Sequence, residues 1–117
     1  MTKKETALVE AVNATPKKEW TRIRDCAPWS GSVYRVQRDG YDFCISFRTP
    51  IAMRTPKGEF VRLWDGYTKT SIGHLNSWNV ETGFPQFNGK AWRFLLPGRK
   101  YAPSALAKAM ERAQETD

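Results

Sequence analysis

Alternating side chains on either side of Asp39-Gly40 constrain the fold of this chain more than any other feature. Residues 41–47 place an aromatic or apolar side chain at every second position, which is typical of a strand with one buried face. A two-residue Asp-Gly loop predicts a β-hairpin with residues 33–38, because its turn requires positive φ at both positions. The cross-strand pairs that bring the apolar side chains to one face are Arg38 with Tyr41, Val36 with Phe43, and Tyr34 with Ile45.

Further turn signals extend this hairpin into a meander. Thr49-Pro50 interrupts the run, and Pro56-Lys57-Gly58 predicts a second hairpin between residues 51–55 and 59–64. Asp65-Gly66 predicts a tight turn into a strand over 67–70. Asn88-Gly89 predicts a third hairpin, between 84–87 and 90–96.

Helices are expected at both ends of the chain and once in the middle. Thr2 and Glu5 have capping-box spacing at the start of a helix over 2–13, and apolar spacing predicts a last helix over 104–114. Ser71 is the expected N-cap of a short helix that ends at Trp78. A second helical turn from Thr15-Pro16 that places Trp20 and Ile23 on one face is possible, or residues 19–24 are extended, and 27–31 are expected to form a loop.

Together these elements predict one α+β domain over residues 1–117. Its centre is an antiparallel β-meander of about five to seven strands, with an N-terminal helix, a C-terminal helix and one short internal helix.

Positive charge is the main functional signal. The net charge is +7, which favours polyanionic partners, although it can also serve solubility alone. Residues 82–110 contain no acidic side chain, and aromatic residues are interleaved with basic ones there. The candidate binding residues in this stretch are Lys90, Trp92, Arg93, Arg99, Lys100 and Tyr101.

Two smaller basic groups lie elsewhere in the sequence. Arg48, Arg54 and Lys57 lie near the proline turns and complete the candidate binding set. A further group, Lys17, Lys18, Arg22 and Arg24, surrounds Trp20. Each of these groups also has a purely structural explanation. Strand arginines can simply face solvent, and Trp92 and Phe94 can belong to the core.

A possible polar site surrounds the only histidine, His74. Its members are Thr70, Ser71, His74 and Asn76. A lone histidine near hydroxyl groups can act as a general base, or it can make a structural hydrogen bond between helix and sheet. Because no catalytic triad, metal-ligand spacing or phosphate-binding glycine motif accompanies it, we expect no enzyme activity, no metal and no cofactor.

Residues 47–52 (Phe-Arg-Thr-Pro-Ile-Ala), followed by 66–76 (Gly-Tyr-Thr-Lys-Thr-Ser-Ile-Gly-His-Leu-Asn), resemble a family of small proteins from phages and other mobile elements. In that family a Thr-Pro-Ile-Ala segment precedes a Tyr-x-x-Thr-(Thr/Ser)-x-x-His-x-Asn segment. The resemblance implies a compact β-rich fold in a phage or plasmid setting, and it implies no activity. Gly73 stands where that family has a polar or basic residue.

Two binding functions are consistent with these features, and an enzyme that uses His74 is a third, less favoured alternative. The first is an accessory protein of a phage or mobile element that binds nucleic acid, most simply DNA, through a basic surface containing aromatic residues. The alternative is a modulator of a host defence complex, of the anti-CRISPR or anti-restriction type, that binds an acidic protein surface. No membrane partner is expected, and the oligomeric state is open.

The two cysteines, Cys26 and Cys44, fit no metal-binding pattern. With no signal-peptide pattern at Met1 and no long apolar run, reduced thiols and a cytoplasmic location are expected, in the host cytosol if the protein is phage-encoded.

Overall fold

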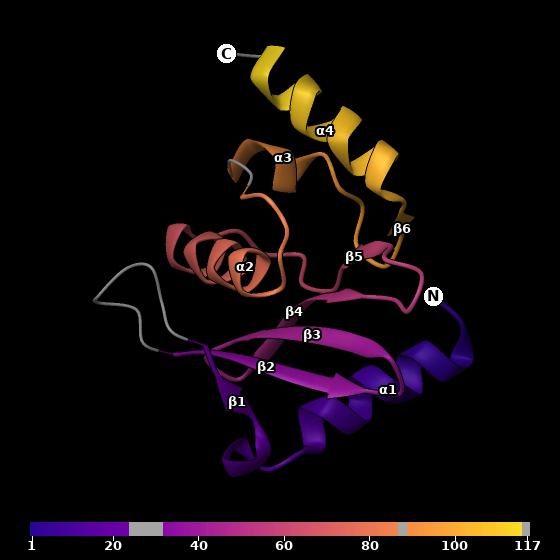
Figure 1. Ribbon diagram of the computed structural model, residues 1–117, viewed down its shortest axis with the longest axis vertical. Coiled ribbons are helices and arrows are strands. Elements are labelled where there is room, and N and C mark those ends of the chain that lie inside the picture. Colours follow the sequence, from indigo (N-terminus) through magenta and orange to yellow (C-terminus); the bar gives the residue numbers. More distant parts are fainter. Residues whose placement is uncertain (24–31, 87–88, 116–117) are drawn as a thin grey trace.

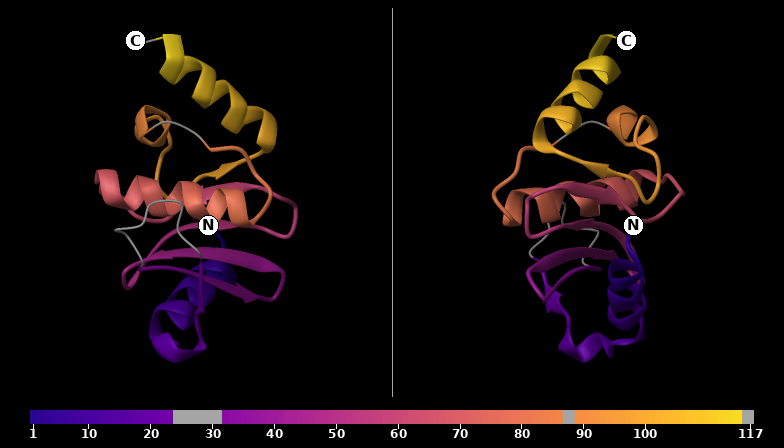
Figure 2. Two further views of the ribbon diagram at one scale, coloured as in Figure 1. Left: turned by 60° about the vertical axis from the view of Figure 1, so that its left-hand side comes forward. Right: turned by 90° about the vertical axis from the view of Figure 1, so that its right-hand side faces the viewer.

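The structure is a computed structural model of the chain, and it describes residues 1–23, 32–86 and 89–115. It is an α+β fold in which one antiparallel sheet lies between helices on its two faces (Figure 1, Figure 2). The strands follow one another in chain order: β1 (Thr21–Arg22), β2 (Val33–Arg38), β3 (Tyr41–Ser46), β4 (Thr49–Arg54), β5 (Phe60–Arg62) and β6 (Lys100–Tyr101).

Helix α1 (Lys3–Ala14) covers one face, and α2 (Lys69–Glu81) covers the other. Beyond α2 lie α3 (Gly89–Arg93) and α4 (Pro103–Glu115) (Figure 1). Each face therefore has its own apolar cluster. The α1 side includes Leu8, Val12, Val36, Phe43, Ile45, Met53 and Val61, and the opposite side includes Cys44, Ile51, Ala52, Phe60, Leu75, Trp78, Trp92 and Leu95.

The Asp39-Gly40 hairpin is confirmed, including its register. Arg38 pairs with Tyr41, Val36 with Phe43 and Tyr34 with Ile45. Asp39 has φ 53° and Gly40 has φ 81°, which are the left-handed conformations that this turn requires. The expected apolar face lies under α1.

The predicted interruption of the strands at Thr49-Pro50 was wrong, because both residues belong to β4. The chain turns earlier, at Phe47-Arg48, where Phe47 has φ 58°. The pairing of β3 with β4 shifts between Cys44 and Ile45, and Pro50 lies opposite Ile45 at this irregularity. A proline is tolerated there, because a bulge does not need every ladder hydrogen bond. The hairpin around 56–58 is confirmed by the pairing of Arg54 with Phe60.

The strand expected over 67–70 was also wrong, because helix α2 begins in this segment. The side chain of Thr68 accepts a hydrogen bond from the Ser71 backbone N–H at 3.0 Å, so Thr68, rather than Ser71, is the N-cap. The helix continues past Trp78 to Glu81, and Ile72, Leu75 and Trp78 are buried against the sheet.

The hairpin around Asn88-Gly89 is contradicted as well. Residues 87–88 lie outside the described residues, and Gly89–Arg93 forms helix α3. Ala91, Trp92 and Leu95 are buried at a spacing that suits a helical turn better than a strand. The sequence also gave no signal for β6, the short strand that pairs with β5.

The two terminal helices are confirmed. The Glu5 backbone donates to the Thr2 hydroxyl at 3.1 Å, and the Thr2 backbone donates to Glu5 Oε1 at 2.9 Å, which completes the capping box. Between α1 and β2, residues 17–19 form a 3₁₀ turn and Thr21–Arg22 is extended. The loop expected over 27–31 lies outside the described residues. Within the described residues, no helix is both long and apolar enough to cross a bilayer.

Candidate nucleic-acid interface

A concave surface of about 420 Å³ lies between the segment 94–101 and helix α4. We call it the C-terminal groove. It combines three basic side chains with two aromatic rings and two aliphatic side chains. The residues that line it are Phe94, Leu96, Arg99, Tyr101, Lys108, Ala109 and Arg112.

Helix α4 forms one wall of the groove. Lys108 and Arg112 are four residues apart, so their side chains leave the helix on one face. Leu106 and Ala113 are buried in the core on the other side. This amphipathic packing presents the basic face of α4 to the groove.

The opposite wall is the segment that leads into β6. The Leu96 backbone N–H donates to Tyr101 Oη at 2.7 Å, and the Gly98 backbone N–H donates to the Arg62 carbonyl at 2.7 Å. Buried Arg62 fixes the base of this wall, because its Nη1 donates to the carbonyls of Trp92 and Leu95 at 2.9 and 3.0 Å. Burial lowers the pKa of Arg62 below its usual value, and no sequence pattern marked it as a structural residue.

The cations of the groove contact its aromatic rings. The Arg99 guanidinium carbon lies 5.7 Å from the Tyr101 ring centroid, and that of Arg112 lies 5.2 Å from the Phe94 ring centroid. Among the described residues, no carboxylate lies within ion-pair distance of Arg99, Lys108 or Arg112. The groove is therefore a concentration of positive charge with aromatic side chains in its wall.

Two of the expected binding residues, Arg99 and Tyr101, line this groove. Lys90 and Arg93 lie next to it in the chain, on α3, and both are exposed. Arg93 stacks on the half-exposed ring of Tyr67, with 4.3 Å between guanidinium carbon and ring centroid. Sequence reasoning missed Arg112, which the four-residue spacing from Lys108 could have identified.

Trp92 is completely buried, so a partner cannot contact its side chain. Its indole Nε1 donates to the Gly66 carbonyl at 2.8 Å. The sequence alternative, that Trp92 is a core residue, is the one that the structure supports.

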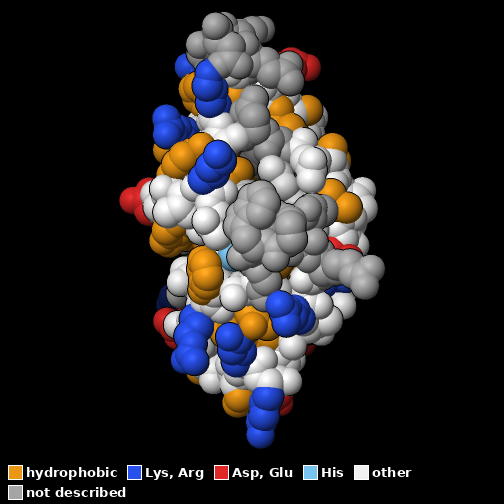
Figure 3. All heavy atoms as spheres, turned by 90° about the vertical axis from the view of Figure 1, so that its left-hand side faces the viewer, with side chains coloured by type: hydrophobic (Ala, Val, Ile, Leu, Met, Phe, Trp, Pro, Cys, Tyr) orange, Lys and Arg blue, Asp and Glu red, His pale blue; other side chains and the backbone are white. Residues whose placement is uncertain are grey.

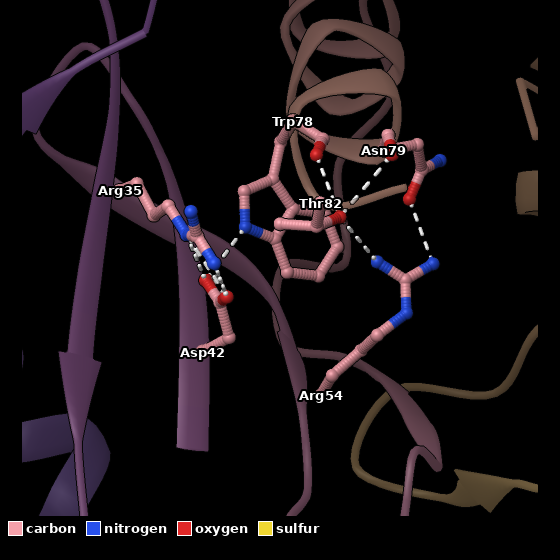
Figure 4. A network of polar contacts seen from close by, with 6 residues as sticks. All are labelled: Arg35, Asp42, Arg54, Trp78, Asn79 and Thr82. Carbon is pink, nitrogen blue, oxygen red and sulfur yellow. Dashed lines mark hydrogen bonds and ion pairs between the residues drawn. The ribbon is translucent and has the colours of Figure 1, made fainter. Parts of the chain in front are cut away.

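Arg54 is buried too, in the polar network of Figure 4. Its guanidinium donates to Asn79 Oδ1 at 2.8 Å and to Thr82 Oγ1 at 3.2 Å, and it stacks 3.6 Å from the Phe84 ring centroid. Burial lowers the pKa of Arg54 to about 10. Arg54 therefore fastens β4 to the end of α2, which excludes the surface role expected for it.

The second half of that network ties the first hairpin to α2. Arg35 forms an ion pair with Asp42, with 2.6 Å between Nη2 and Oδ2. The Trp78 Nε1 donates to Asp42 Oδ1 at 3.0 Å (Figure 4). Asp42 therefore accepts hydrogen bonds from both Arg35 and Trp78. Polar contacts, as well as apolar ones, hold α2 against this face of the sheet.

Lys57 and Lys100 belong to a different pocket, of about 340 Å³, on the α1 side. Two carboxylates, Glu5 and Glu59, line the same pocket. Lys100 Nζ lies 3.0 Å from Glu5 Oε2, so its charge is already neutralised by a buried partner. These two lysines therefore do not join the C-terminal groove.

Arg48 is exposed in the β3–β4 turn. At the β1 edge of the sheet, Lys17 Nζ stacks 5.0 Å from the Tyr34 ring centroid, and Lys18 and Arg22 are exposed. Arg24 lies outside the described residues. Figure 3 shows Lys and Arg side chains in an upper and a lower group on one face, with Asp and Glu side chains mostly at its margins.

The possible polar site is only partly assembled. His74 is completely buried, and its Nδ1 lies 2.7 Å from the hydroxyl of Ser46, which lies 3.3 Å from the Ser71 hydroxyl. Thr70 is exposed and Asn76 is half-buried. The geometry joins α2 to β3 through Ser46, a residue that sequence reasoning did not include.

Cys44 is a free thiol buried beneath α2. Burial raises the pKa of this thiol well above its usual value, which disfavours the reactive thiolate. Cys26 lies outside the described residues. In the part of the chain that the structure describes, no cluster of three histidine, cysteine or acidic side chains could hold a metal ion.

Comparison with known proteins gives one match. The sequence model of a family of unknown function (DUF8033) matches residues 16–93. This range includes β1 to β5, α2 and α3, and it ends just before the C-terminal groove. No curated protein and no solved structure matches the chain.

Proposed function

The chain belongs to the DUF8033 family of unknown function, and we propose from its own surface that it is a small accessory protein that binds nucleic acid, most simply DNA. The observation that carries the proposal is the charge of the C-terminal groove. Arg99, Lys108 and Arg112 surround it, and among the described residues no carboxylate lines it. Because the family match ends at residue 93, the proposal depends on residues of this chain outside the matched region.

A phosphate backbone is the polyanion that best fits such a surface. Each phosphate neutralised by a lysine or arginine releases counterions, which supplies most of the affinity of non-specific binding. Within the part of the chain that the structure describes, the three cations have no carboxylate partner, so they can contact phosphates without breaking an ion pair there. Lys100, by contrast, would first have to leave Glu5.

The basic surface continues beyond the groove onto α3. Lys90 and Arg93 are exposed there, and α3 packs directly against α4. A nucleic acid in the groove could therefore place neighbouring phosphates against α3. This arrangement suits a chain of phosphates better than a single small anion.

The test is binding of a labelled oligonucleotide at about 50 mM salt and then at increasing salt, read by fluorescence anisotropy. We expect wild-type affinity to fall steeply with salt. The variant R99S/K108S/R112S should bind at least about tenfold more weakly, and its plot of log K against log salt should be less steep by about 2 to 3.

The matched control removes three exposed charges outside the groove, as K18S/R22T/K57S. It has the same net charge as the groove variant, so a purely global charge effect would weaken both equally. Equal weakening would contradict the groove as the interface. Absence of wild-type binding at low salt would contradict nucleic-acid binding itself.

A further inference from the structure

We propose that the C-terminal groove takes an unpaired base, so that the preferred partner is single-stranded nucleic acid rather than duplex. This inference rests on the proposed function and deepens it. It requires more than charge: the groove must offer a stacking surface that a paired base cannot use.

The stacking surface comes from the two aromatic residues and their arginines. Phe94 and Tyr101 are half-buried in the wall of the groove. Arg112 and Arg99 lie over these rings. Bases stack on aromatic rings and on guanidinium planes alike. A base can therefore stack on the guanidinium groups or take their place on the rings, and the arginines can contact the flanking phosphates.

The stacking surface selects against a duplex. In a duplex each base has its faces covered by its neighbours and offers only its edges in the grooves. The aromatic rings here belong to an open concave surface of about 420 Å³. Only a base that has left its stack can lay its face against such a surface.

The wall is also pre-organised. The bond from the Leu96 backbone to Tyr101 Oη fixes the Tyr101 ring, and the pairing of Tyr101 with Phe60 anchors β6 to the sheet. Arg62 holds the carbonyls of Trp92 and Leu95 beneath it. A rigid stacking surface loses little entropy on binding, which favours affinity.

The pocket on the α1 side provides an internal comparison. It is of similar size, at about 340 Å³, and it contains Lys57 and Lys100. It is also lined by Glu5 and Glu59, which would repel phosphates. Of these two pockets, the C-terminal groove alone combines rings with positive charge and no carboxylate. Because every base has a stacking face, we expect little dependence on base identity.

The experiment compares three labelled ligands at the same salt concentration. They are oligothymidylate and oligouridylate of about 15 nucleotides and a DNA duplex of about 15 base pairs. We expect wild type to bind both single strands about tenfold more tightly than the duplex. The two single strands distinguish DNA from RNA as the source of the unpaired base.

Two variants remove the base site and keep all charges. F94L/Y101L deletes both rings, and A109F fills the groove in case the double variant folds poorly. Each should lower single-strand affinity about tenfold and leave duplex affinity unchanged. F47L, the control, removes an exposed aromatic ring outside the groove and should retain the single-strand preference.

Equal wild-type affinity for single strand and duplex would overturn the inference. Unchanged single-strand binding in folded F94L/Y101L and A109F would overturn it as well. In both cases salt-dependent binding would still support the proposed function. If none of the three ligands bound at low salt, the proposed function would fail together with the inference.

Discussion

Lys100 Nζ lies 3.0 Å from Glu5 Oε2, which joins the sixth strand to the first turn of the N-terminal helix. Glu5 also accepts from the hydroxyl of Tyr41 at 2.9 Å and from the Thr2 backbone. One buried carboxylate therefore connects the N-terminal helix, the sixth strand and the first hairpin.

Because Lys100 is committed to Glu5, its loss should affect folding rather than binding. K100M should lower the melting temperature, and the affinity of the folded protein for nucleic acid should stay within about twofold of wild type. Thermal denaturation and a salt titration of binding measure the two effects separately. A loss of affinity equal to that of R99S would show that Lys100 contacts the nucleic acid.

Glu5 should make the fold sensitive to acid. Burial raises its pKa, but the hydrogen bonds from Thr2, Lys100 and Tyr41, together with the Lys100 charge, outweigh burial and hold the pKa at about 2. Since this is below the usual value of 4.5, the stabilisation is present above pH 4.5 and is lost as pH falls toward 2. Urea denaturation across this range should show it.

E5Q provides the control for that pH dependence. It should be less stable than wild type by about 1–3 kcal/mol at neutral pH, and the difference should shrink as pH falls and Glu5 takes up its proton. A constant difference from pH 7 to pH 2 would contradict the role assigned to Glu5.

Arg54 should not tolerate replacement by lysine. An ammonium group cannot donate to Asn79 and Thr82 in the same fork geometry while stacking flat on Phe84. We expect R54K to lower the free energy of unfolding by about 2 kcal/mol. R48K, at an exposed turn position, should be neutral, and equal effects of the two substitutions would argue against the network in Figure 4.

The contact between His74 and Ser46 should stabilise the packing of α2 on β3. H74A leaves a cavity and removes the shorter of two hydrogen bonds made by the Ser46 hydroxyl, so we expect a loss of about 2–4 kcal/mol. Chemical denaturation measures this loss, with T70A at the exposed neighbouring position as the control. A fully stable H74A protein would contradict the structural role and would favour a chemical role for this histidine.

Local chemistry explains which parts of the fold could be predicted. The Asp39-Gly40 hairpin and the Thr2–Glu5 capping box depend on residues close in sequence, so the local pattern of side chains was sufficient to predict both. Asn88-Gly89 carries the same turn signal, yet helix α3 follows it, because Ala91, Trp92 and Leu95 are buried together. That burial depends on α2 and the sheet, which no local pattern describes.

The candidate site shows the same division. The acid-free stretch was visible in the sequence, and Arg99 and Tyr101 do line one groove. Arg54 and Arg62 look like solvent-facing strand residues, but the face that carries them is covered by α2 and α3. Whether a strand arginine is exposed depends on what packs above it, and that could not be inferred from alternation.

The pairing of β5 with β6 has a consequence for folding. Every described strand pairs with the next one in the chain, but the earlier connections are short, whereas residues 63–99 separate β5 from β6. This is the longest connection between paired strands among the described residues, and it includes α2 and α3. Bringing its two ends together costs the most chain entropy, so the pairing of β5 with β6 is expected late in folding. The edge that carries Tyr101 can accordingly open while the meander stays intact.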